Sequence, residues 1–270
     1  MKHLKNAIVF SVKNWMLILP LFVLTALASL LSGVAGTAMD LGKLWTILGS
    51  LNNIRSPGNV FTTLPGLITA ATVGSGIWAF LFQFVTLPTT YGLVNKSLET
   101  GNASLNDIGS ALSDNFVQYL MYFLGTIVIG LAAGLGSLIL ILVLSLPAAL
   151  LKGVGAALMV IFMLALFVVL VILGILISMW FSAMIVDKLD IIASVRKSVE
   201  IVKSCFWKVL AITVLVSIAT AIAGSILGIL GGIPLLGPII YSAVPTAQSY
   251  IMIVFLMSLY REKTGKANMI

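Results

Sequence analysis

Long apolar runs separated by short polar stretches dominate this sequence. A helix that crosses a bilayer needs about 20 mostly apolar residues, because hydrocarbon about 30 Å thick is crossed at about 1.5 Å per residue. Six segments meet this requirement, and we predict that they span the membrane: 15–39, 66–93, 116–145, 153–186, 206–230 and 239–260. The expected fold class is therefore all-α, a polytopic membrane helix bundle that forms one membrane domain over residues 1–270.

The segment 116–186 needs its own argument, because its only charged residue is Lys152 and its length would suffice for three short spans. With six spans, 12 of the 15 Lys and Arg residues lie on the inner side, and only Lys43, Arg55 and Lys152 lie outside. An extra span would move Lys188, Arg196, Lys197, Lys203 and Lys208 to the outer side. The positive-inside rule therefore favours six spans.

This count places both termini, 95–115 and 188–205 in the cytoplasm, and 40–65, 146–152 and 231–238 outside. A cleaved signal peptide is the alternative for the first run, since Lys2 and Lys5 precede it and the small residues at 36–38 could serve as a cleavage site. The apolar run 15–39 is longer than the core of such a peptide, so we expect it to remain as a span.

Similar starts and ends of the spans indicate an internal repeat. The odd-numbered spans begin at Asn14-Trp15, Asn115-Phe116 and Cys205-Phe206, and the even-numbered spans end at Asn95-Lys96, Asp187-Lys188 and Arg261-Glu262. Each start follows a short amphipathic stretch, so the predicted unit is a cytoplasmic surface helix followed by a two-span hairpin. The three units would cover 1–96, 97–188 and 189–263, related by an axis along the membrane normal.

The surface helix over 189–204 has the clearest pattern, with Ile192, Val195, Val199 and Val202 on one apolar stripe. Such a helix lies in the interface with its cations toward anionic lipid. We therefore predict that Arg196, Lys197, Lys203 and the nearby Lys208 contact anionic lipid. Simple anchoring of the span ends is the alternative. The second surface helix begins at Ser104 and Asp107, which have the spacing of a capping box.

Composition narrows the function classes. The chain is 60% hydrophobic and 9% charged, with a net charge of +7. In a soluble protein this charge would suggest nucleic acid, but here it follows from the positive-inside rule, so we expect no nucleic-acid partner. With one cysteine, Cys205, and one histidine, His3, the chain offers no metal cluster, and no catalytic motif or cofactor fingerprint is present. We expect no enzyme, catalytic residue, metal or cofactor.

Polar residues within the predicted spans gather in two places, and these are the candidates for a ligand path: Gln83, Thr86, Pro88 and Thr89 in the second span, and Pro245, Thr246, Gln248 and Ser249 in the sixth. An amide in hydrocarbon must face protein or water, so the two glutamines either bond neighbouring helices or line a cavity. Glycines at four-residue spacing are predicted to permit close helix packing, within the chain or in a homo-oligomer: Gly130, Gly134, Gly224, Gly228 and Gly232.

Several stretches of the second half are similar to a known set of proteins: 183–187, 193–207, 231–234 and 259–261. They resemble prokaryotic six-span proteins related to the membrane domain of glycerophosphoryl diester phosphodiesterases. The resemblance is strongest over 180–262, and we expect no soluble phosphodiesterase domain beside it. It implies a helical module of a prokaryotic plasma membrane, without hydrolase activity.

These observations favour a non-enzymatic membrane module that binds or passes a lipid or other apolar molecule, or that supports a partner membrane complex. Membrane lipids are the expected partners, beside a membrane protein or a second copy of the chain. A secondary transporter or channel for a small uncharged solute is the first alternative. An intramembrane enzyme is the second, disfavoured by the lack of ionisable groups deep in the spans.

Overall fold

The computed structural model describes residues 2–31, 76–150, 152–233 and 236–266. Within these ranges the chain is helical and has no strand. The α-helices are α1 (Lys2–Lys13), α2 (Leu19–Leu31), α5 (Gly76–Thr100), α6 (Ile108–Asp114), α7 (Phe116–Leu150), α8 (Lys152–Leu176), α9 (Trp180–Asp187), α10 (Ile191–Gly228) and α11 (Leu236–Lys263). Short 3-10 turns, Trp15–Ile18, Leu105–Asp107 and Ile229–Gly232, join some of them. The all-α prediction is confirmed.

Four of the described helical segments are long and apolar enough to cross a membrane: Phe116–Ile141, Ala157–Asp187, Ile191–Gly228 and Leu236–Lys263. A fifth arises if α1 and α2, which meet at a bend of 88°, count as one broken span. The predicted first and second spans lie partly in 32–75, outside the described residues. Within the described residues, the structure thus supports a membrane protein with four or five spanning segments, and the full set of six stays a prediction.

The three predicted span starts share one backbone conformation. Asn14 (φ −109°, ψ 39°), Asn115 (φ −124°, ψ 13°) and Cys205 (φ −137°, ψ 23°) each leave the helical region between a surface helix and the following segment. Each also directs its side chain at the carbonyl oxygen four residues earlier, on Phe10, Ala111 and Ile201. This bond holds the last turn of the surface helix while the backbone changes direction, so the three residues act as hinges.

The ends of α5, α9 and α11 pack together at the centre of the fold. Their final turns include Val94, Met184 and Leu259, all fully buried. Each of these helices is followed by a residue with positive φ, namely Gly101, Lys188 and Gly265, a common way to end a helix. The surface helix α1 covers α11 at this end, where His3 and Glu262 lie 3.0 Å apart. The packed ends of α5, α9 and α11, with α1 beside them, therefore hold the spans together at this end of the molecule.

Polar side chains join these helix ends. Arg261 of α11, only 6% exposed, donates to the Asn95 side chain of α5 at 2.8 Å. Tyr260 and Lys266 both donate to the carboxylate of Asp187 in α9, at 2.6 and 2.8 Å. The three similar span ends at Asn95, Asp187 and Arg261 thus lie in one region of the fold. The hydrogen bonds between them matter because a buried polar group without a partner is unfavourable.

The segment before α6 forms the predicted capping box, in which Asp107 accepts from the backbone of Ser104 at 2.7 Å. Lys96 of α5 donates to the same carboxylate at 2.8 Å. These hydrogen bonds, the one from Lys96 first, lower the pKa of Asp107 to about 2. The second surface helix is therefore tied to the end of α5.

The predicted fourth span is interrupted. It consists of α8 and α9 with a turn at Ile177–Met179 between them, whereas the sequence predicted one helix over 153–186. Ser198 of α10 bridges the break, accepting from the Met179 backbone at 3.0 Å and donating to the Leu176 carbonyl at 2.8 Å. Because Ser198 is fully buried, these two bonds replace water for backbone groups that the turn releases from the helical pattern.

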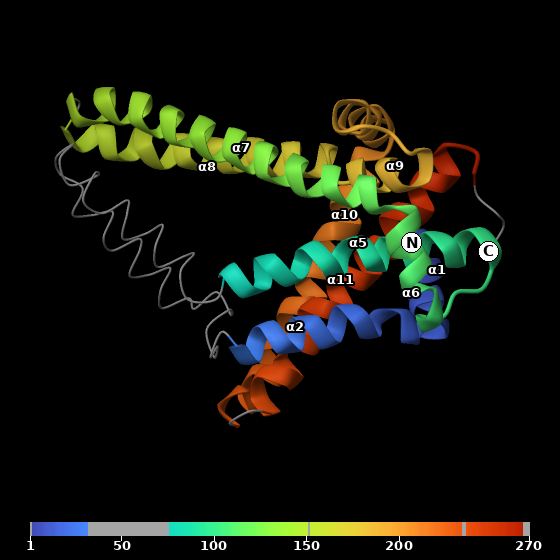
Figure 1. Ribbon diagram of the computed structural model, residues 1–270. Helices are drawn as coiled ribbons and strands as arrows, with labels where there is room; N and C mark the ends of the chain where they lie inside the picture. Colours follow the sequence, from blue (N-terminus) through green and yellow to red (C-terminus); the bar gives the residue numbers. More distant parts are fainter. Residues whose placement is uncertain (1, 32–75, 151, 234–235, 267–270) are drawn as a thin grey trace.

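Figure 1 shows how these elements are arranged. α7 and α8 run side by side and project away from the end of the molecule at which α1, α6 and α9 lie. α10 and α11 also pack on each other, but they leave that end in a different direction. As a result, α8 and α10 meet near the turn at Ile177–Met179 and then diverge.

Candidate functional site

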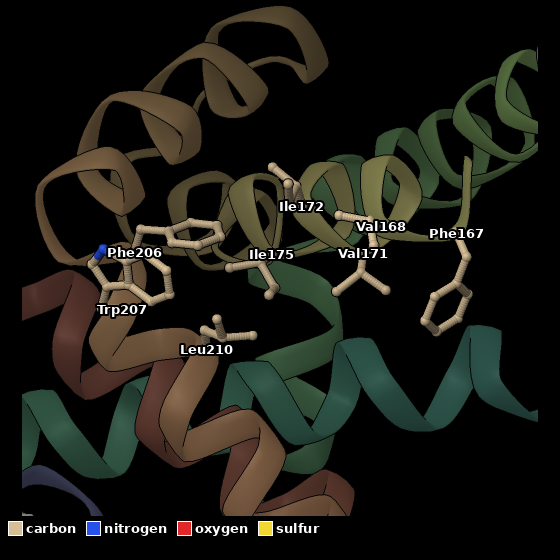
Figure 2. Close-up of a pocket in the computed structure, with 8 residues that line it drawn as sticks. All are labelled: Phe167, Val168, Val171, Ile172, Ile175, Phe206, Trp207 and Leu210. Carbon is tan, nitrogen blue, oxygen red and sulfur yellow. The ribbon is translucent and has the colours of Figure 1, made fainter. Parts of the chain in front are cut away.

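An open groove lies where α8 and α10 diverge. Its upper part is a hollow of about 260 Å³ lined only by apolar side chains: Phe167, Val168, Val171, Ile172 and Ile175 of α8, and Phe206, Trp207 and Leu210 of α10. Figure 2 shows Phe206, Trp207 and Leu210 of α10 near Ile175 of α8, with Phe167 farther along α8. We call this hollow and its continuation the α8–α10 groove.

The continuation is a second hollow of about 550 Å³, which shares Val171, Ile175 and Leu210 with the first. It is further lined by Gly174 and Ser178 at the end of α8, by Thr213, Val214, Ser217, Ile218 and Ala221 of α10, and by Met252 of α11. The shared residues make the two hollows one site. Along α10 it extends from Phe206 to Ala221, which is about 22 Å at 1.5 Å per residue.

Regular spacing in the sequence produces both walls. On α10, groove residues recur every three or four positions from Leu210 through Thr213 and Ser217 to Ala221, so they share one helix face. On α8 the same spacing links Phe167 with Val171 and Gly174, and Ser178 follows in the turn after α8. Gly174 lowers the wall at the middle of the groove, because it has no side chain there.

The hinge at Cys205 places the end of the groove beside the surface segment of α10. Trp207, two residues beyond the hinge, is 78% exposed. An indole in this position suits the boundary between headgroups and hydrocarbon. Lys203 and Lys208 flank the hinge, and neither forms an ion pair with a described residue. This end of the groove therefore has the character of a membrane interface.

The cations predicted to contact lipid all lie on or beside this surface segment. Arg196 and Lys203 are exposed, whereas Lys197 and Lys208 are half-buried, and Lys197 approaches Glu200 at 3.5 Å. The face opposite them packs against protein, with Ser194, Ser198, Ile201 and Val202 buried. Contact of the four cations with anionic lipid stays a prediction.

The predicted ligand-path residues do not line the groove. Thr86, Pro88 and Thr89 of α5 and Thr246 of α11 are buried, and the hydroxyls of Thr89 and Thr246 donate to carbonyls of their own helix at 2.5 and 2.7 Å. Gln248 and Ser249 are half-buried and Pro245 is exposed. The side chain of Gln83 lies outside the described part of the chain. Whether the two glutamines face one path stays a prediction.

The glycines at four-residue spacing do not sit in close helix contacts within the described residues. A Cβ at Gly130, Gly134 or Gly228 would meet nothing within 4 Å, and one at Gly224 would make ordinary contact with Tyr241 at 3.9 Å and Val244 at 4.0 Å. The surroundings of Gly232 lie outside the described side chains. Close packing occurs instead at Gly125, where a Cβ would approach the Trp180 ring to 2.7 Å. An oligomer contact through the open glycines stays a prediction.

The described residues contain no group of three or more His, Cys, Asp and Glu side chains arranged to hold a metal ion. In comparisons with known proteins, no family model, curated protein or solved structure matches this chain. The fold and the site together define a helical membrane protein with an apolar groove between two diverging spans. Sequence reasoning missed this groove, because its lining is made of the same Leu, Ile and Val residues that face lipid elsewhere.

Proposed function

We propose that this chain is a non-enzymatic membrane module that binds a lipid or lipid-like molecule by an apolar chain in the α8–α10 groove. The observation that carries the proposal is the groove itself, about 22 Å long and lined almost wholly by apolar side chains of two helices able to cross a membrane. One leaflet of hydrocarbon is about 15 Å deep, so the groove is long enough for a whole lipid chain.

The surroundings support this occupant. Water would find no partner in the upper hollow, where every lining residue is apolar. A lipid chain, in contrast, would gain dispersion contacts along both walls. Trp207 and the cations Lys203 and Lys208 stand at one end, where the polar end of a lipid would lie.

The wider architecture that we propose is six spans in three hairpins, each preceded by a cytoplasmic surface helix, in a prokaryotic plasma membrane with both termini inside. The three hinges at Asn14, Asn115 and Cys205 support it, as does the packing of α2 on α5, α7 on α8 and α10 on α11. In this arrangement the groove lies between the second and third hairpins.

A substitution that fills the groove tests the proposal. Leu210→Trp adds an indole between α8 and α10, whereas Leu215→Trp adds the same group to a position of α10 that is 43% exposed and does not line the groove. We expect native mass spectrometry of the purified wild type and of Leu215→Trp to show a retained lipid-sized mass, and Leu210→Trp to lose it. Equal retention by all three proteins, or retention by none, would contradict the proposal.

A further inference from the structure

The α8–α10 groove contains three hydroxyl groups that the protein itself leaves without hydrogen bonds. Ser178, Thr213 and Ser217 line its wider hollow. The Ser178 oxygen is buried and has no partner, and neither Thr213 nor Ser217 forms a hydrogen bond with any described residue. Of the three residues, Ser178 has a buried oxygen, Thr213 is half-buried and Ser217 is exposed. A hydroxyl without a hydrogen-bond partner is unfavourable in an apolar environment, so a partner for these groups must come from the occupant of the groove.

Other threonines within the described helices behave differently. Thr25, Thr89, Thr126, Thr220 and Thr246 each donate to the carbonyl four residues earlier, at 2.5–2.8 Å. This local bond satisfies a hydroxyl in an apolar environment. Thr213 does not form it, although it belongs to the same helix as Thr220. Its hydroxyl is thus available to the groove.

The three hydroxyls lie well inside the apolar part of the site. Thr213 is eight residues beyond the hinge at Cys205, which is about 12 Å along α10, and Ser217 is one turn farther. Ser178 faces the same hollow from the turn at the end of α8. Among the residues that the structure describes, no charged one lines either hollow. The groove therefore offers neutral hydrogen-bond donors in a place where a charged group would be costly.

We propose that the molecule bound in this groove carries a neutral carbonyl oxygen away from its ends, which accepts hydrogen bonds from the hydroxyls of Ser178, Thr213 and Ser217, two at a time. This inference rests on the proposed function, since it names the chemical class of the same occupant. A plain hydrocarbon chain would leave all three hydroxyls unbonded. A carbonyl has no proton of its own to place, and its two lone pairs accept from hydroxyls on both walls.

The test compares two matched probes, the symmetrical dialkyl ketone diheptyl ketone and the straight alkane of the same length, pentadecane. Both are added at equal mole fraction to the purified full-length protein in detergent micelles. Binding is followed by the rise in the thermal unfolding midpoint, which reports affinity for the folded state. We expect the ketone to bind about five times more tightly than the alkane, the size of effect that one hydrogen bond gives.

Variants show whether the difference comes from these hydroxyls. In the variant Ser178→Ala/Thr213→Val/Ser217→Ala, the alkane should bind as before and the ketone should lose its advantage. The control Thr220→Val/Ser225→Ala removes two hydroxyls of α10 that already bond their own helix, and it should keep the preference for the ketone. Equal binding of both probes by the wild type overturns the inference but leaves the proposed function standing. Failure of both probes to bind overturns the proposed function as well.

A second measurement does not depend on the folding of any variant. The infrared carbonyl stretch of the ketone bound to the wild type should shift to lower wavenumber than that of the ketone in empty micelles, because hydrogen bonding weakens the carbonyl bond. An unshifted band would overturn the inference.

Discussion

At the scale of single residues, the glycines of α7 differ in what their missing side chain permits. Gly125 lies against the ring of Trp180, and Ile191 is the next group beyond it. Gly130, five residues along the same helix, faces open space among the described residues. The spacing of glycines in the sequence indicated Gly130 and Gly134 as contacts, because spacing reports a shared helix face and not what lies opposite that face.

Gly125→Ala is therefore expected to destabilise the protein by about 1–3 kcal/mol, since the new methyl group forces Trp180 or α7 to move. The measurement is the free energy of unfolding in detergent. Gly130→Ala is the matched control and should be neutral or slightly stabilising. Equal losses of stability for the two variants would contradict the packing described for Gly125.

Asp107 carries a pH dependence. Its folded pKa of about 2 lies below the ordinary value of about 3.9, owing to the hydrogen bonds from Lys96 and Ser104. A depressed pKa contributes stability that is present above the unfolded pKa and is lost as the carboxylate protonates in the folded state. The thermal midpoint of the wild type should therefore fall between about pH 4 and about pH 2. Asp107→Asn should start lower at neutral pH and show a smaller fall, and an identical acid profile would exclude this role of Asp107.

At the scale of elements, the positions where helices begin could be predicted from the sequence, and the break within one of them could not. Asn14, Asn115 and Cys205 stand where polar residues give way to long apolar runs, and the structure bends at each. The turn at Ile177–Met179 contains no proline, glycine or charged residue from which it could be predicted. It depends on Ser198, which is distant in sequence and reaches it only through tertiary packing.

Ser198→Ala should accordingly destabilise the protein by about 2–4 kcal/mol, because one substitution leaves a buried N–H and a partly buried carbonyl without partners. Ser204→Ala in the same helix removes only a bond from an exposed side chain to the Ile201 carbonyl, and it should change stability by less than about 0.5 kcal/mol. Chemical unfolding of the two variants side by side tests this. A neutral Ser198→Ala would mean that the break between α8 and α9 needs no bridge.

The α8–α10 groove belongs to the same scale. Its walls could not be predicted, because an apolar residue that faces lipid and one that lines a groove have the same sequence pattern. Only the direction in which α10 leaves the hinge separates α8 from α10. Thr213 and Ser217 were the residues in the sequence that could have indicated the groove. They were not a sufficient sign of it, because hydroxyls within a span more often bond to a carbonyl of their own helix.

At the scale of the whole molecule, the helical fold and the membrane class followed from the length and apolarity of the runs, and the orientation rests on charge. We expect both ends of the chain and the turn after α5 to lie inside. In a Cys205→Ala background, single cysteines introduced at Asn102 and Thr264 should resist an impermeant thiol reagent added to intact cells, while one at Ile233 should react. Labelling of Asn102→Cys or Thr264→Cys from outside would contradict this orientation.

On the proposed function, the space between α8 and α10 holds an apolar molecule within the membrane. A cryo-electron microscopy density map of the full chain in native lipid nanodiscs would show this molecule. We expect elongated non-protein density along Val171, Ile175 and Leu210, with a branch or bulge beside Ser178 and Thr213. A groove closed by direct contact of α8 with α10, or one that holds no density stronger than the surrounding lipid, would contradict it.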